Sequence, residues 1–93
     1  MIRSFACDET RKIYDGFASR RLPQNLLGVM QRKLRMLDAA TRLIDLRVPP
    51  NNRLEALKGG RAGQYSIRVN QQWRVCFRWE NNGAEDVEIV DYH

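Results

Sequence analysis

Arginine residues recur in the C-terminal half of this 93-residue chain, inside stretches that are otherwise rich in apolar residues. They include Arg68, Arg74 and Arg78, and the printed sequence closes on Tyr92 and His93. A planar guanidinium can bind two phosphate oxygens at once. Histidine is the side chain that most readily exchanges a proton near neutral pH. These residue types favour a basic surface that holds phosphate, with titratable groups at its edge.

Alternation of apolar and polar residues predicts the strands that would position these side chains. The apolar residues at 65, 67 and 69 alternate with polar ones, and the run from Trp73 to Trp79 alternates with arginine and cysteine. A period of two indicates half-buried strands. Polar turn residues separate the runs. The expected strands form a four-stranded meander over residues 54–57, 64–69, 73–79 and 85–92.

The apolar pattern also predicts the register of the last strand. Val87 and Ile89 should face the core, because a slip of one residue would turn both towards water. Tyr92 then lies beside Arg74, on a working face that also carries Arg68 and Arg78. The expected cross-strand neighbours on this face are Arg74 with Val90, Cys76 with Glu88, and Arg78 with Asp86.

The N-terminal half predicts two helices. Residues 1–5 resemble a short first strand, and Asp8 is a suitable N-cap for a helix whose stripe runs to Phe17. Pro23 suits the start of a second helix that extends to Ala40. Its apolar stripe should pack against the sheet, with Arg32, Lys33 and Arg35 facing away, and residues 47–52 should form an ordered loop. The predicted fold class is α+β, with two N-terminal helices packed on an antiparallel sheet.

Length and charge limit the classes of function. We expect residues 1–93 to form a single domain. The net charge of +5 suggests a polyanionic partner such as nucleic acid, although a merely basic protein has the same charge. We find neither an apolar run that could cross a membrane nor a secretion signal, so a cytoplasmic location is expected. One histidine with the scattered Cys7 and Cys76 does not make a metal site, and a disulfide between the cysteines would be unusual in that compartment.

A glycine-rich turn at residues 58–63 precedes the second strand. Its glycines allow close approach to the backbone, and Lys58 and Arg61 flank it. The turn could hold phosphate. Taken alone, it is more typical of an ordinary hairpin with solvated cations.

Four short motifs carry a family resemblance: LKG-x-R-x-G from Leu57, SIRVN from Ser66, WR-x-x-F from Trp73, and the final DYH. Together they resemble the HigB branch of the RelE/ParE toxin superfamily, including its plasmid-type killer toxins, and the similarity runs along the whole chain. The resemblance implies a microbial-ribonuclease-like fold. It also implies cleavage of messenger RNA in the ribosomal A site, without a metal or other cofactor. The implied partners are the ribosome and a helix-turn-helix antitoxin of the HigA type, which alone would contact operator DNA.

The resemblance also implies roles for individual residues. Arg74 would stabilise charge on the phosphate in the transition state, and His93 would protonate the leaving oxygen. Tyr92 would stack on a base or donate to phosphate, Asp91 would orient His93, and Lys58 would stabilise charge. The remaining cations are expected to contact the RNA backbone, with weaker support for the last two: Arg61, Arg68, Arg53 and Arg78.

Glu55 departs from the pattern, because some HigB-type toxins carry a second histidine at this position. In the related YoeB toxins a glutamate base, an arginine and a C-terminal histidine work together, and Glu55, Arg74 and His93 recur here in that order. Glu55 is therefore a candidate general base, but a solvated glutamate at a strand edge fits the sequence equally well. Two other functions stay open: a non-catalytic inhibitor that occupies the ribosome, and a ParE-like gyrase poison. The arginine, tyrosine and histidine set disfavours the gyrase poison.

Overall fold

The computed structural model describes residues 1–92 of the chain. Two α-helices and several short 3-10 helices precede and interrupt a four-stranded sheet. The helices are α1 (Asp8–Tyr14), η1 (Gln24–Leu26), α2 (Leu27–Ala39), η2 (Leu43–Arg47), η3 (Pro50–Asn52) and η4 (Gly59–Arg61). The strands are β1 (Glu55–Ala56), β2 (Gln64–Arg68), β3 (Trp73–Glu80) and β4 (Gly83–Asp91).

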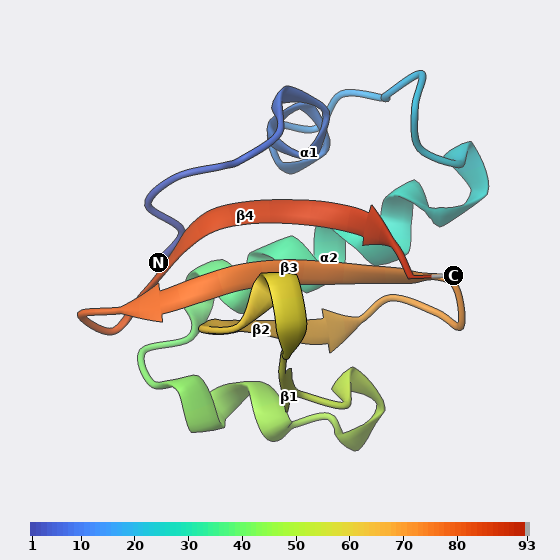
Figure 1. Ribbon diagram of the computed structural model, residues 1–93. Helices are drawn as coiled ribbons and strands as arrows, with labels where there is room; N and C mark the ends of the chain where they lie inside the picture. Colours follow the sequence, from blue (N-terminus) through green and yellow to red (C-terminus); the bar gives the residue numbers. More distant parts are fainter. Residues whose placement is uncertain (93) are drawn as a thin grey trace.

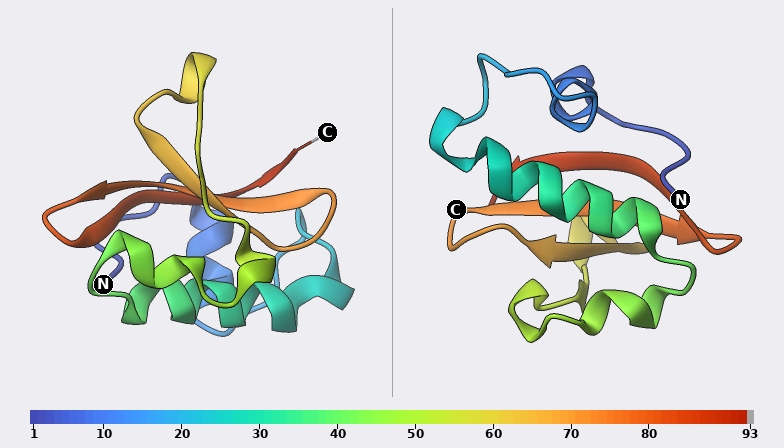
Figure 2. Two further views of the ribbon diagram at one scale, coloured as in Figure 1. Left: turned by 90° about the horizontal axis from the view of Figure 1, so that it is seen from below. Right: turned by 180° about the vertical axis from the view of Figure 1, so that it is seen from behind.

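The four strands pair in sequence order, and each pair is antiparallel. The helix α2 crosses one face of this sheet, and the β1–η4 segment rises from the opposite face (Figure 1, Figure 2). This arrangement confirms the predicted α+β class, the meander and the second helix. It also leaves the face that carries Arg74 on the side of the β1–η4 segment, away from α2.

The register between β3 and β4 follows the prediction over part of its length. Arg74 is paired with Val90 and Cys76 with Glu88, as expected. Beyond Cys76 the register shifts, so that Arg78 pairs with Glu85 and not with Asp86. The extra residue lies in β4, where Asp86 adopts a left-handed backbone with φ of 53°. The predicted pairing was therefore wrong by one residue at this end, because alternation alone does not reveal a bulge.

The first residues of the chain form two isolated bridges and no regular strand. Ile2 bridges to Ala84 and Phe5 to Val87, both parallel to β4. The predicted first strand at residues 1–5 was therefore wrong in type. The bridges nevertheless cover the outer edge of β4, whose backbone groups would otherwise be open to pairing with another chain.

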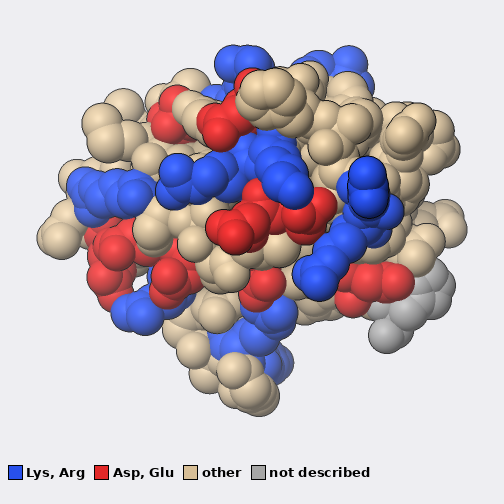
Figure 3. Space-filling view, turned by 90° about the horizontal axis from the view of Figure 1, so that it is seen from above, with Lys and Arg blue, Asp and Glu red and all other residues tan. Residues whose placement is uncertain are grey.

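Acidic and basic side chains are interleaved on the side of the molecule seen in Figure 3, which looks down on α1 and β4. Lys12 lies 3.0 Å from Glu9 within α1, and Arg61 lies 3.0 Å from Glu88 of β4. This side therefore presents both signs of charge and is not a basic patch.

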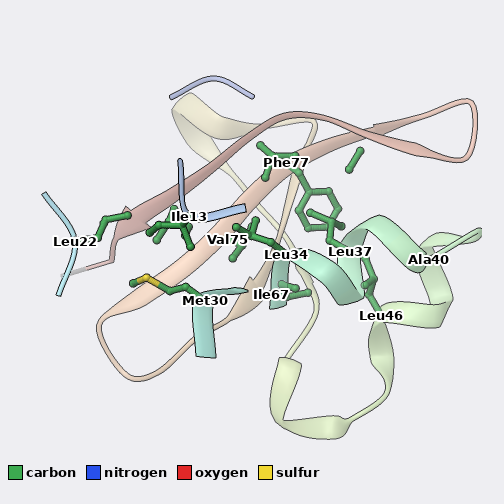
Figure 4. Close-up of a cluster of buried hydrophobic side chains, with 13 residues drawn as sticks. Ile13, Leu22, Met30, Leu34, Leu37, Ala40, Leu46, Ile67, Val75 and Phe77 are labelled. Atoms are coloured by element: carbon green, nitrogen blue, oxygen red, sulfur yellow. The ribbon is translucent and has the colours of Figure 1, made fainter. Parts of the chain in front are cut away.

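The core lies between α2 and the sheet (Figure 4). Met30, Leu34 and Leu37 of the predicted stripe are buried, and they meet apolar residues of β2 and β3 such as Ile67 and Phe77. The α1 stripe is shorter than predicted, because α1 ends at Tyr14 and Gly16 then adopts a φ of 95°. Residue Phe17 is consequently 65% exposed, and Asp8 is the first helical residue after an N-cap at Cys7.

Asn52 anchors the predicted loop at residues 47–52, whose end forms η3. Its side chain is fully buried and donates to the carbonyl of Leu46, 3.1 Å away. Its Oδ1 accepts a 2.6 Å hydrogen bond from Nζ of Lys33. Lys33 therefore does not point freely into solvent as expected, because it ties α2 to the segment that leads into β1.

The two cysteines are both free, with Cys76 buried and Cys7 half-buried. Burial is also the main reason that the pKa of the Cys76 thiol is raised. Among residues 1–92, no helix is long and apolar enough to span a membrane.

Asp38 joins three N-terminal elements and gives the fold a pH-dependent contribution to stability. Its Oδ1 accepts from the amide of Ile2 at 2.8 Å, and its Oδ2 accepts from the hydroxyl of Tyr14 at 2.9 Å. The hydrogen bond from Ile2 is the main cause of a lowered pKa for this carboxyl, and that from Tyr14 also lowers it. The folded state therefore favours the ionised form.

We expect Asp38→Asn to lower the free energy of unfolding near neutral pH by about 1–2 kcal/mol, the scale of hydrogen bonds to a charged group. Because the folded pKa lies below the unfolded value, the wild-type advantage should be present above about pH 4 and shrink as pH falls. Urea titrations at several pH values test this, with the exposed Asp15→Asn as control. A wild-type advantage that is constant down to low pH would contradict it.

Candidate active site

Arg74 lies at the centre of the candidate site and is almost buried, with 8% of its surface exposed. Its Nε donates to Oγ of Ser66 at 2.7 Å, and its Nη2 donates to the carbonyl oxygen of Arg53 at 2.6 Å. The same Nη2 lies 3.7 Å from Oε1 of Glu55. Nη1 makes no hydrogen bond to a described residue. The guanidinium is therefore held on one side and keeps a donor group for a ligand.

Strand pairing explains why these groups meet. Glu55 of β1 lies opposite Ser66 of β2, and Ser66 lies opposite Cys76 of β3. Directly opposed residues point to the same face of a sheet. Arg74 is two residues before Cys76 on that face, so its long side chain reaches back diagonally to Ser66. The predicted shared face is thus confirmed, and the structure adds that Arg74 is almost buried on it.

The carbonyl of Arg53 reaches Arg74 because the chain turns sharply between η3 and β1. Arg53 adopts a left-handed backbone with φ of 44° and ψ of 54° at the end of η3. A residue other than glycine held in this region costs on the order of 1 kcal/mol, so the surrounding structure must impose the turn. The buried Asn52 immediately before it supplies that constraint.

The ring of Tyr92 also contacts the guanidinium. Its centroid lies 5.5 Å from the central carbon of the Arg74 guanidinium, within the range of a cation–π contact. The residue is 43% exposed, so part of the ring can still accept a stacked base. A hollow of about 280 Å³ opens next to it, lined by Arg61, Val90, Asp91 and Tyr92.

The structure places Glu55 on the same face as Arg74. Its side chain is half exposed and close enough to form a long ion pair with Arg74. Glu88 of β4 lies on this face too, but it binds Arg61 at 3.0 Å. Glu55 is therefore the carboxylate of β1 that can both contact Arg74 and reach solvent or a substrate hydroxyl.

The glycine-rich turn holds its two cations differently. Nη1 of Arg61 donates to Glu88 and to Oε1 of Gln64, each at 3.0 Å. Lys58 is exposed as the N-cap of η4, and its amine forms no hydrogen bond or ion pair with a described residue. The turn itself depends on Gly59 and Gly63, which have φ values of 64° and 91°.

The other predicted RNA contacts surround Arg74 at different distances. Arg68 is its direct cross-strand neighbour in β2, and the side chain of Arg53 is exposed. Arg78 lies four residues further along β3, where Glu80 binds it at 2.6 Å and Asp86 lies 3.7 Å away. The hydrogen bond to Glu80 is the main cause of a raised pKa for Arg78.

Asp91 is the last residue of β4. Oδ2 of Asp91 accepts a 3.0 Å hydrogen bond from the side-chain amide of Gln72, in the turn before β3. His93, the predicted acid, lies outside the described residues. Its role therefore stays a prediction from the sequence.

Sequence reasoning did not identify two groups that hold Arg74. Ser66 is fully buried. Alternation along the strands places it on the same face as Arg74, and a buried serine on that face needs a hydrogen-bond partner, so the sequence could have predicted this contact. The carbonyl of Arg53 gave no signal, because the identity of a side chain does not reveal where its own carbonyl points.

Replacement of Ser66 by alanine tests whether this contact holds a buried charge. We expect Ser66→Ala to lose about 1–3 kcal/mol of unfolding free energy, because Nε of Arg74 would be left without its acceptor. Ser4→Ala is a matched control, since Oγ of Ser4 accepts an exposed hydrogen bond from the amide of Asp86 that water can replace. That control should cost about 0.5 kcal/mol or less. Equal losses in denaturant titrations of both variants would contradict the assignment.

Comparison with known proteins identifies the family. Residues 3–93 match the family model of the RelE-like toxin of the type II toxin–antitoxin system HigB. Toxin HigB-1 of Vibrio cholerae is 48% identical over 65 residues, which cover 70% of this chain and 68% of that protein. The protein named Endoribonuclease HigB of Proteus vulgaris is 29% identical over the full length of both chains.

Solved structures agree on the fold. A chain of the YoeB–YefM complex from Staphylococcus aureus superposes with a TM-score of 0.61 at 17% identity, covering 100% of this chain and 98% of the other. At that identity the likeness concerns the fold alone. The family match over nearly the whole sequence shows that the chain belongs to the HigB-type RelE-like toxins of type II toxin–antitoxin systems.

Proposed function

We propose that this toxin is a ribosome-dependent endoribonuclease that cleaves translated messenger RNA in the A site and thereby arrests growth. The observation that carries the proposal is the Arg74 guanidinium, fixed by Ser66 and the Arg53 carbonyl with Nη1 left for a ligand. Support also comes from the Proteus vulgaris relative, which is named an endoribonuclease. The net charge of +5 suits an RNA substrate.

Metal-independent cleavage of RNA requires three functions at one phosphodiester. A base removes the proton of the 2′-hydroxyl, whose oxygen attacks the adjacent phosphorus. Cationic groups stabilise the extra negative charge on the five-coordinate phosphorus, and an acid protonates the departing 5′-oxygen. The bond from phosphorus to the 5′-oxygen breaks as the new bond forms. The products are a 2′,3′-cyclic phosphate and a free 5′-hydroxyl.

Arg74 supplies the charge stabilisation in this scheme. Its buried guanidinium needs little rearrangement when a phosphate arrives, so its interaction with the transition state is preorganised. Glu55 is the proposed base, because its carboxylate is half exposed and lies 3.7 Å from Arg74. A ligand phosphate bound at Arg74 would therefore lie near a proton acceptor.

The last three residues of the sequence are proposed to supply most of the remaining roles. His93 is the proposed acid, and Asp91 is proposed to orient it. Tyr92, whose ring covers Arg74, stacks on a base beside the scissile phosphate. Lys58 contributes charge from the projecting turn once RNA is bound.

The peripheral arginines are proposed to contact the RNA backbone with graded importance. Arg68 comes first, because it is the direct neighbour of Arg74. Arg61 is next and keeps part of its guanidinium tied to Glu88. The exposed Arg53 follows. Arg78 has the weakest support, because two carboxylates already neutralise it.

The proposed partners follow from the family. The solved neighbours are complexes of YoeB with YefM, so neutralisation by a bound antitoxin is expected here too. We propose a helix-turn-helix antitoxin of the HigA type, contact with operator DNA only through that antitoxin, and action on ribosomes in the cytoplasm.

Replacement of Arg74 by lysine tests the central role while retaining the charge. We expect Arg74→Lys to reduce messenger cleavage by on the order of 10²-fold, because the ammonium group of lysine cannot reproduce the planar, fixed set of N–H donors of a guanidinium. His93→Gln should also cut slowly if His93 is the acid. Primer extension on a messenger, after induction in cells and with purified ribosomes, measures both. Arg20→Lys, at an exposed site in the α1–α2 connection, is the control and should cut at the wild-type rate.

The same assay distinguishes the alternative functions. Cuts that appear only with translating ribosomes support the proposal, because the ribosome must orient the messenger for a site with so few catalytic groups. Growth arrest without cuts would indicate a non-catalytic inhibitor. Equal cutting of free and translated RNA would refute ribosome dependence.

A further inference from the structure

A hollow rich in cations is lined by residues of α2, of the segment around η3, and of the end of β2 and the turn after it. Its volume is about 540 Å³. It is lined by Val29, Arg32, Lys33, Met36, Pro49, Asn51, Arg68, Val69 and Asn70.

The charge of this hollow is uncompensated. Three of its lining residues are cations, Arg32, Lys33 and Arg68, and the described residues that line it include no carboxylate. Neither arginine forms an ion pair with a described residue. Lys33 donates to the neutral Asn52, and burial, followed by the nearby Arg32, lowers the pKa of its amine. An anion in the hollow would relieve the repulsion among these groups.

Hydrogen-bond donors complement the cations. Oδ1 of Asn70 accepts from the backbone amides of Gln72 and Trp73, at 2.9 and 2.8 Å. Its amide nitrogen is therefore left as a donor at the rim, as is the side chain of the exposed Asn51. Guanidinium and amide groups together suit the oxygens of phosphate and ribose.

Arg68 connects the hollow with the candidate active site. It lines the hollow and is also the direct cross-strand partner of Arg74, a pairing that brings Cβ atoms to about 5 Å. On the other side, Asn51 precedes by two residues the Arg53 carbonyl that binds Arg74. A ligand with regularly repeated anionic groups could therefore occupy both places at once.

We infer that this hollow binds phosphate groups of the same RNA strand whose neighbouring phosphodiester lies at Arg74. The inference rests on the proposed function and extends it to a second subsite for single-stranded RNA. Arg32 and Arg68 contact the phosphates, and Lys33 adds positive charge nearby. Asn51 and Asn70 donate hydrogen bonds to oxygens of the RNA backbone. An acidic peptide is the competing ligand, but the pairing of Arg68 with Arg74 favours a ligand that reaches both places.

The test measures binding without cleavage, with fluorescently labelled 2′-O-methyl oligouridines in a short form that spans only the Arg74 site and in a longer form. We expect the wild type to bind the longer form more tightly. Arg32→Gln and Arg68→Gln should weaken binding of the longer form. Each should reduce the slope of log affinity against log salt by about 0.7, the value for one lost phosphate contact on a single strand. The matched control is Arg35→Gln, because Arg35 is exposed on the same helix and does not line the hollow.

Three results would overturn the inference. The first is no gain in affinity of the wild type with oligonucleotide length, and the second is an equal salt slope for all variants. The third is that Arg32→Gln and Arg68→Gln bind RNA as the wild type does but bind the antitoxin more weakly. The last result would assign the hollow to an acidic peptide. Failure of the proposed function has a different signature, because the wild type would then leave messenger uncut on ribosomes. If the wild type cuts messenger on ribosomes but the substitutions in the hollow leave RNA binding unchanged, this inference alone is rejected.

Discussion

Burial of a permanently charged guanidinium inside a sheet is the constraint on which the candidate site depends. Removing such a charge from water is costly unless hydrogen bonds and opposite charge replace the lost solvent. Arg74 meets this requirement with a buried hydroxyl, a backbone carbonyl and a more distant carboxylate. Because those three groups lie on one side, the remaining donors face the place where a phosphate would bind.

Much of the fold serves to bring these partners together. The β1–β2 pairing places Glu55 and Ser66 in one row, and the left-handed turn at Arg53 directs its carbonyl to Arg74. Asn52 fixes this left-handed turn, and the hydrogen bond from Lys33 to Asn52 ties the turn to α2. The helix thus has two functions: its apolar stripe builds the core, and its polar side supports the segment that holds the arginine.

Alternation was sufficient to predict the meander, the apolar face and most of the β3–β4 register, because a slip would expose Val87, which is fully buried. The bulge at Asp86 and the turn at Arg53 could not be predicted, since both depend on left-handed backbone at residues other than glycine. The face of Glu55 could not be assigned from the short strand predicted at residues 54–57, and the observed pairing of Glu55 with Ser66 resolved it. Arg74 was found by its motif, but its burial follows from long-range contacts that no local pattern encodes.

The central claim is that Arg74 is held in place before RNA binds and offers its remaining donors to phosphate. Solution NMR of the arginine side chains, with and without an uncleavable 2′-O-methyl oligonucleotide, tests this most directly. The structure predicts an Nε–H of Arg74 that exchanges slowly with water in the free protein and stays bonded to Ser66, while the Nη signals shift on binding. An Nε–H that exchanges as fast as that of the exposed Arg20, or Nη signals that do not respond to RNA, would contradict the account.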